Sequence, residues 1–265
     1  MANRSATCNA TGYQGCTSCS GYRYLIGTSC ALPPLAAGSS HTCAVAAETG
    51  AVRCWGRSDF GQATPPATLP PSWAVAGGFY HTCAIAAETG AVRCWGANWY
   101  GQATPPTGLL PSSAVAANGY YTCAVAAETG AVRCWGFNNN GQATPPADLP
   151  RPSAIAAGIE HVCIIAAETG AVRCWGSNNY GQATPPADLP RPSAISTGAF
   201  HTCIVAAETG AVRCWGSNLY GLPRPSFITS GGDYTCVVAA QTGAVRCWGD
   251  NSFGQATPPA DLPPT

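Results

Sequence analysis

The stretch SAIAAGIEHVCIIAAETGAVRCWGSNNYGQATPP, residues 153–186, decides the fold, because nearly the same stretch recurs along the chain. A Cys-Trp pair marks each copy, with its Cys at positions 54, 94, 134, 174, 214 and 247. The last interval is shorter than the others because the fifth copy runs from Gly221 straight into Leu222 and Pro223, without the Gln-Ala-Thr-Pro-Pro-Ala-Asp segment. Six copies at near-constant spacing predict a repeat architecture.

Each copy is expected to form three or four short antiparallel strands. In the fourth copy we predict strands over residues 153–157, 162–167 and 171–175, and a weaker outer strand near 182–184. The triplet Glu168-Thr169-Gly170 predicts a hairpin loop in which Gly supplies the positive φ of a tight reversal. Pro185 and Pro186 cannot donate to a sheet ladder, so they mark the connection between copies.

The whole chain is therefore predicted to be an all-β protein, a β-propeller with one copy per blade. Helical solenoids are excluded because the copies lack amphipathic helices. Six copies give six blades if they alone close the ring, and seven if residues 1–31 contribute strands.

Two Cys flank the hairpin in every copy, eleven residues apart. A two-residue loop places Cys43 opposite Cys54, whereas a bulged three-residue loop shifts them by one position. Direct opposition brings the two Cβ atoms within disulfide reach. Free buried thiols and a metal site are the alternatives. We predict one disulfide hairpin per repeat: Cys43–Cys54, Cys83–Cys94, Cys123–Cys134, Cys163–Cys174, Cys203–Cys214 and Cys236–Cys247.

The motif A-V-A-A-G-x-x-H-T-C-A-V, followed by T-G-A-V-R-C-W-G-x-N-x-x-G-Q, resembles the regulator of chromosome condensation repeat family. The resemblance covers residues 32–265 and implies a propeller, usually of seven blades. This chain departs from that pattern in its six copies and in the Cys pair of each copy. These features resemble extracellular and bacterial relatives, so the nucleotide-exchange function is not carried over.

Residues 1–31 contain no copy of the repeat and are expected to form a separate Cys-rich segment before the propeller of residues 32–265. Cys16-Thr17-Ser18-Cys19, with the residues up to Cys30, resembles a growth-factor-receptor-type Cys-rich module. Pairing within the segment has three patterns. The four Cys concerned are Cys8, Cys16, Cys19 and Cys30.

The amino-acid composition limits the possible partners and the cellular location of the protein. Charged residues are only 9% of the chain and the formal net charge is zero, so no basic footprint for nucleic acid exists. No apolar run is long enough for membrane insertion. Sixteen Cys, an even number, indicate an oxidising, extracellular or cell-surface location. Residues 1–30 hold no signal-peptide core, so we expect a part of a longer precursor in which Met1 is not the natural start.

The polar residues favour scaffolding over chemistry. His41, His81, His161 and His201 share one repeat position, which could suggest a ring of metal ligands. However, two copies carry Tyr there, so we expect a hydrogen bond that stabilises the turn and no metal or cofactor. Nearly every other polar residue is copied five or six times, whereas an active site is singular. We therefore predict no enzyme activity, and we assign the repeated Trp to packing between blades.

The loop after Trp-Gly is where the copies differ most, in aromatic and amide content. A ring of such loops on one propeller face is a natural recognition site, and unconstrained turns are the alternative. The candidate recognition residues are Phe60, Trp99, Tyr100, Phe137, Tyr180 and Tyr220.

These observations predict a non-catalytic structural and protein-interaction module that self-assembles into an extracellular coat or filament. The alternative is a carbohydrate-binding, lectin-like propeller that uses the loop aromatics. The chain also carries two N-glycosylation motifs and five Thr-Pro-Pro motifs that suit O-linked sugars. The candidate glycosylation sites are Asn3, Asn9, Thr64, Thr104, Thr144, Thr184 and Thr257.

Overall fold

The structure is a computed structural model that describes residues 24–26, 29–31, 35–46, 48–217, 227–230, 234–238, 245–249, 251–254 and 256–257. All regular elements within these residues are β-strands. Over the same residues, no helix is long and apolar enough to cross a membrane.

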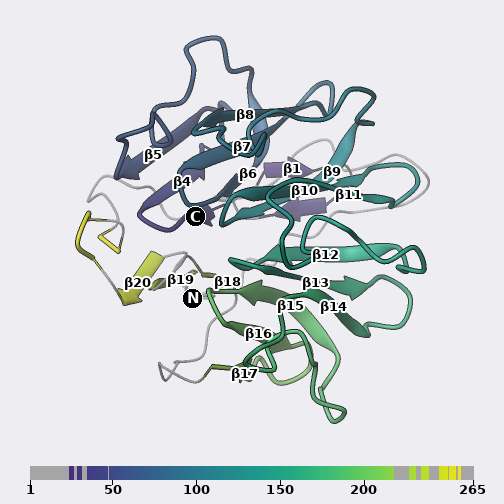
Figure 1. The fold of residues 1–265 in the computed structure, drawn as a ribbon. Coiled ribbons are helices and arrows are strands. Elements are labelled where there is room, and N and C mark those ends of the chain that lie inside the picture. The colour runs from purple at the N-terminus through teal and green to yellow at the C-terminus, as the bar shows by residue number, and fades with distance from the viewer. Residues whose placement is uncertain are drawn as a thin grey trace, which may run out of the picture.

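Each copy forms one three-stranded antiparallel sheet, and the six sheets are arranged around a common axis (Figure 1). A separate two-stranded sheet joins β1 (Tyr24–Ile26) and β2 (Ser29–Ala31). The blade strands are β3 (Leu35–Ala37), β4 (His41–Val45) and β5 (Val52–Gly56); β6 (Ser72–Gly77), β7 (His81–Ala86) and β8 (Val92–Gly96); β9 (Ser112–Asn118), β10 (Tyr121–Ala126) and β11 (Val132–Gly136); β12 (Pro152–Ala157), β13 (His161–Ala166) and β14 (Val172–Gly176); β15 (Pro192–Thr197), β16 (His201–Ala206) and β17 (Val212–Gly216); β18 (Phe227–Ser230), β19 (Tyr234–Val238) and β20 (Val245–Gly249).

The first strand of each blade lies innermost and packs beside the first strand of the next blade, as β6 does beside β9. The innermost strand of the last blade, β18, packs beside β3 of the first. The ring therefore closes with six blades, which confirms the predicted fold class.

The strands predicted for the fourth copy agree with β12, β13 and β14 to within one residue at each end. The weaker outer strand predicted near residues 182–184 is wrong, because these residues form a turn. Gly181 has a φ of 78° and the prolines that follow donate no hydrogen bond, so an extended ladder cannot continue here. Within the described residues, each blade has three strands.

The hairpin register places the paired Cys directly opposite one another, as Cys43 and Cys54 show. Their Cα atoms are 4.0 Å apart, and a disulfide joins the pair. Cys236 aligns with Cys247 in the sixth blade, and Cys247 is disulfide-bonded, but the side chain of Cys236 lies outside the described residues, as do those of the four N-terminal Cys. The same disulfide occurs in the next four blades, at Cys83–Cys94, Cys123–Cys134, Cys163–Cys174 and Cys203–Cys214.

Neighbouring blades are joined by a repeated hydrogen-bonded seam around the carbonyl of the Gly-Gln motif. The Gln62 carbonyl accepts from Trp95 Nε1 at 3.0 Å and from Thr82 Oγ1 at 2.8 Å, both in the next blade. Trp95 is 8% exposed, which confirms its predicted packing role between blades. Buried indole N–H groups need such an acceptor. Equivalent bonds run from Trp135, Trp175 and Trp215 to Gln102, Gln142 and Gln182.

The repeated His completes this seam. His41 Nε2 lies 2.8 Å from Thr82 Oγ1 of the next blade. Since the Thr82 hydroxyl donates to Gln62, Nε2 carries the hydrogen and donates to the hydroxyl oxygen. The imidazole packs over Gly38, where a Cβ would lie 2.3 Å from His41 Cε1, and this explains the Gly-x-x-His spacing. The predicted hydrogen bond exists, but it joins two blades instead of stabilising the turn.

The seam between the third and fourth blades uses different residues. Tyr121 replaces His, and its hydroxyl donates to the carbonyls of Gly158 at 2.9 Å and His161 at 2.7 Å. The next blade carries Val162 where the others have Thr, so no hydroxyl is left without a partner there. Asn118 stands where the His-bearing blades have Gly. Three positions have changed together, two in one blade and one in its neighbour.

Replacing the seam hydroxyl should destabilise the ring. In Thr82→Val, His41 Nε2 loses its partner while buried, and the expected loss is about 1–3 kcal/mol of unfolding free energy. Thr82→Ser keeps the hydroxyl and is expected to lose less. Guanidinium unfolding followed by Trp fluorescence measures both variants. Equal losses in the two variants would contradict a role for the hydrogen bond.

The innermost strands enclose a cavity of about 380 Å³ on the propeller axis, lined mainly by Ala, Val and Ile. The fifth blade carries Ser196 and Thr197, and the sixth Thr229 and Ser230, at positions where the first four copies have Ala or Gly. Thr197 is 2% exposed, and among the described residues its hydroxyl has no hydrogen-bond partner.

Burying a hydroxyl without a hydrogen-bond partner destabilises the folded state, and an apolar side chain of the same shape removes that penalty. Thr197→Val should therefore raise the unfolding free energy by about 1 kcal/mol. Thr202→Val is the matched control, because its hydroxyl bonds to Gln182 and His161 and its loss should have the opposite sign. Chemical denaturation measures both, and a destabilised Thr197→Val would show that the hydroxyl is satisfied in solution.

Candidate functional site

One propeller face gathers the two loops that vary most between copies. Because the strands are antiparallel, the hairpin between the first two strands and the loop after the third emerge at the same end of a blade. We call this end the loop face. It carries the Gly-x-x-His hairpins and the loops between Trp-Gly and Gly-Gln.

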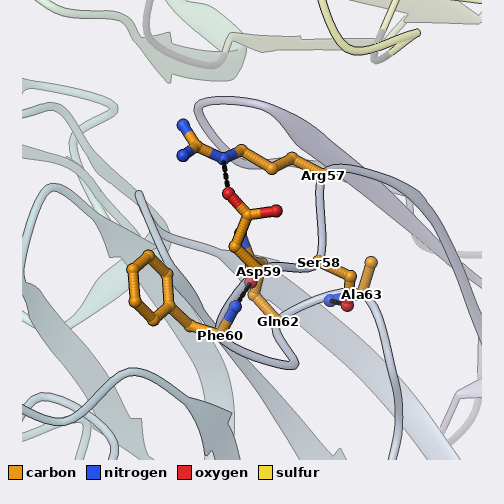
Figure 2. Close-up of polar contacts among 6 residues, drawn as sticks. All are labelled: Arg57, Ser58, Asp59, Phe60, Gln62 and Ala63. Carbon is orange, nitrogen blue, oxygen red and sulfur yellow. Dashed lines mark hydrogen bonds and ion pairs between the residues drawn. The ribbon is translucent and has the colours of Figure 1, made fainter.

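The Trp-Gly loops of the first four copies are held by their own side chains, as Figure 2 shows for the first copy. The buried Gln62 Oε1 accepts from the Phe60 amide at 3.0 Å, and Ser58 Oγ accepts from the Ala63 amide at 3.2 Å. Arg57 Nε donates to Asp59 Oδ2 at 2.6 Å. The turn is fixed from within, which leaves the Phe60 ring projecting from the loop (Figure 2).

Seven aromatic side chains of the first three copies meet on the loop face and form what we call the aromatic cluster. Neighbouring ring centroids are as close as 4.7 Å, between Phe60 and Trp99, and 5.0 Å, between Tyr100 and Phe137. Phe60 is 43% exposed, Trp99 55% and Tyr100 51%. The members of the cluster are Phe60, Phe79, Tyr80, Trp99, Tyr100, Tyr120 and Phe137.

The cluster is connected to the sixth copy through Arg57. Its guanidinium lies 5.4 Å from the Tyr80 ring centroid and 4.7 Å from that of Phe253. Such cation–π contacts are favourable at this distance. The surface therefore spans the point where the first and last copies meet.

The aromatic cluster is electrically neutral. Partial burial raises the pKa of Tyr120, with smaller contributions from Tyr80 and Tyr100, so its phenol stays protonated at physiological pH. Arg57, the cation beside the rings, is paired with Asp59. Several ring pairs meet edge to face, with interplanar angles of 82° for Phe60 and Trp99 and 86° for Phe79 and Tyr120, whereas Tyr80 and Tyr120 are tilted at 41°. The exposed rings consequently do not form one flat platform.

Four of the six predicted recognition residues come together in this cluster: Phe60, Trp99, Tyr100 and Phe137. Tyr180 is exposed but lies apart, 5.0 Å from Phe200 between ring centroids, and Tyr220 is outside the described residues.

Sequence reasoning missed Phe79, Tyr80 and Tyr120, which occupy the variable positions of the Gly-x-x-His hairpins. The first copy has Ser39-Ser40 there, and this asymmetry was the signal that could have found them.

The predicted glycosylation sites fall into two groups, of which only the Thr sites lie within the described residues. All five Thr of the Thr-Pro-Pro motifs are exposed. The Thr104 hydroxyl accepts from Asn98 Nδ2 at 2.8 Å, and the same bond recurs at Thr144, Thr184 and Thr257. Asn3 and Asn9 lie outside the described residues.

No group of three His, Cys, Asp or Glu side chains among the described residues is placed to hold a metal ion. Burial lowers the pKa of His41 to about 4 and the pKa of His81 and His161 to about 3, so these imidazoles are neutral at physiological pH.

Blades of one repeated design, stapled by disulfides and joined by a Trp-Gln-Thr-His seam, define a β-propeller of tandem repeats. The chain belongs to the regulator of chromosome condensation (RCC1) repeat family. This confirms the resemblance seen in the sequence. The family matches all six copies, over residues 35–62, 74–102, 113–142, 153–182, 193–222 and 227–255.

Solved structures share this fold at low sequence identity. The ectodomain of the Physcomitrella patens receptor kinase CR4 has a TM-score of 0.68 at 24% identity, over 81% of this chain and 63% of that chain. The CRINKLY WD40 ectodomain of the Arabidopsis thaliana receptor kinase ACR4 has a TM-score of 0.67 at 23% identity, over 82% and 80%. Yeast RCC1 (Prp20), solved bound to Kap60, has a TM-score of 0.63 at 17% identity, over 83% and 70%. No curated protein sequence matches.

Proposed function

We propose that this chain is a non-catalytic, extracellular protein-interaction propeller that assembles into a larger coat or filament, with the loop face as its contact surface. The single observation that carries the proposal is the aromatic cluster. Monomeric proteins rarely expose such a concentration of large apolar side chains without using it for binding. Aromatic residues are enriched in the cores of protein interfaces.

The extracellular location is supported by the disulfides. Bridges persist in oxidising compartments and are rare in the cytosol. Two of the structural relatives are receptor ectodomains, which fits this setting. Residues 1–31 would then be a separate Cys-rich segment preceding the propeller of residues 32–265.

The proposal that the chain is not an enzyme is supported by the structural role of its repeated polar side chains. The repeated His, Thr and Gln residues are buried in the seams between blades and serve packing. Protein binding is the use recorded for the yeast relative, which was solved with Kap60.

A lectin-like function is the second candidate, because Trp99 and Tyr100 are half exposed. A flat sugar ring stacks best on a flat aromatic platform, whereas Trp99 stands at 82° to Phe60 and 69° to Tyr80. This geometry favours a protein contact over a glycan.

Self-association of the purified, oxidised chain tests the proposed function. We expect its mass in sedimentation velocity to rise with concentration and electron micrographs to show ordered polymers. A chain that stays monomeric, yet binds a glycan array saturably and loses that binding in Trp99→Ala, would establish the lectin instead.

Glycosylation is expected in the natural protein. The exposed Thr-Pro-Pro hydroxyls would carry O-linked sugars, and Asn3 and Asn9 would carry N-linked sugars. Intact-mass measurement of natively sourced protein should exceed the polypeptide mass of 26.9 kDa by whole sugar units. A mass equal to that of the bare chain would contradict the expectation.

A further inference from the structure

The chain carries both an aromatic surface and a set of proline-rich segments, and we propose that they bind one another. Specifically, we propose that the aromatic cluster seats the Thr-Pro-Pro segment of a second copy of this chain. The inference rests on the proposed assembly function and names the contact that would build the assembly.

The shape of the cluster fits an extended proline segment. Trp99 meets Phe60 at 82° and Tyr80 at 69°, so the exposed rings present apolar faces and edges at several angles to solvent. Recognition of proline-rich chains generally uses grooves lined by aromatic side chains, into which the pyrrolidine rings pack.

The proposed donor is displayed on the outside of the same molecule. In the fourth copy, Thr184 and Ala187 are exposed and Pro185 and Pro186 are half-buried, outside any strand. The two prolines have fixed φ angles and no N–H groups. Docking this segment therefore leaves few donors to desolvate and costs little conformational entropy.

Charge favours a second copy as the occupant. The formal net charge of the chain is zero, so copies do not repel one another. The Gln-Ala-Thr-Pro-Pro segment is uncharged, and the one cation beside the rings, Arg57, is already paired with Asp59. Neither surface would bury an unpaired charge on contact.

The interface would be modest in size. Three rings, each about half exposed, offer roughly 300 Å² of aromatic surface if an aromatic side chain has about 200 Å² in total. A stable interface needs about 800 Å² on each partner. The contact is therefore expected to be weak and transient. Donor and acceptor are different surfaces, so the contact repeats from copy to copy into an open polymer.

Sedimentation velocity with variants and a competing peptide tests the inference. Two variants each remove one ring of the aromatic cluster, Trp99→Ala and Tyr100→Ala. Tyr180→Ala is the matched control, because Tyr180 is 56% exposed, lies in the equivalent loop and is not part of the cluster. The peptide spans residues 181–190, and its control replaces Pro185 and Pro186 with Ala.

We expect wild type and Tyr180→Ala to associate equally, and Trp99→Ala and Tyr100→Ala to require at least tenfold higher concentration. The peptide should return the wild type to monomer, and the Ala peptide should not. Association that survives both aromatic variants, or that both peptides inhibit equally, overturns the inference and leaves the proposed assembly intact. A wild type that stays monomeric overturns both.

Discussion

Reduction of the disulfides is expected to unfold the propeller. Each bridge closes a short loop between Cys eleven residues apart, worth about 3 kcal/mol in the chain-entropy view. Five such bridges together are comparable to the whole unfolding free energy of an ordinary domain, about 5–15 kcal/mol. The Ala-rich core supplies little apolar bulk to replace them.

Trp fluorescence and circular dichroism of the reduced, alkylated chain measure this effect. The buried Sγ atoms should react slowly in the native state, so reduction is carried out in denaturant before transfer to buffer. Non-reducing peptide mapping of the starting protein is the control and should show one linked peptide pair per copy. Bridges between neighbouring copies, free thiols at Cys83 and Cys94, or a reduced chain with native spectra would each contradict the prediction.

Acid is expected to destabilise the ring steeply. The unfolded chain binds protons on His with a pKa near 6.5, whereas the folded state holds His41 near 4 and His81 and His161 near 3. Between these values the unfolded state binds more protons, so stability is full above pH 6.5 and is lost as the pH falls. For three His this amounts to roughly 6 kcal/mol between pH 7 and pH 5.

Denaturant midpoints measured from pH 7.5 to pH 4.5 test this dependence. The control carries His81→Tyr and Thr122→Val, which reproduces the Tyr and Val found at the third seam. It removes one of the three titrating groups, so the slope of stability against pH should fall by about a third. An unchanged slope would assign the acid sensitivity to other groups.

The blades could be predicted from the repeat because the local sequence signals agreed with one another. Gly170 marks the hairpin, short runs rich in Val, Ile and Cys mark the strands, and the spacing of Cys163 and Cys174 matches direct opposition across two strands. The predicted outer strand near residues 182–184 failed because Gln182 is used by the next blade instead of a ladder. Its carbonyl accepts from Trp215 and Thr202. The sequence of one copy does not show a hydrogen bond that joins two neighbouring copies.

The aromatic cluster was only half predictable for the same reason. Phe60 and Trp99 stood out as variable loop residues, but their contact with Tyr80 depends on the loops of two copies meeting on one face. The partner of His41 was hidden as well, since Thr82 lies 41 residues away. The joint replacement by Tyr121 and Val162, at the same separation, was a readable sign of that contact.

The altered third seam restricts how this gene can be lengthened or recombined. A duplicated second copy would join itself correctly, because His81 faces the following blade and Thr82 faces the preceding one, so His81 of the first duplicate would meet Thr82 of the second. A duplicated fourth copy would set His161 against Val162 and bury an imidazole without a partner. Whether a copy can be inserted without destabilising the ring therefore depends on its seam residues on both sides. Copies that look interchangeable in sequence consequently have fixed positions in the ring.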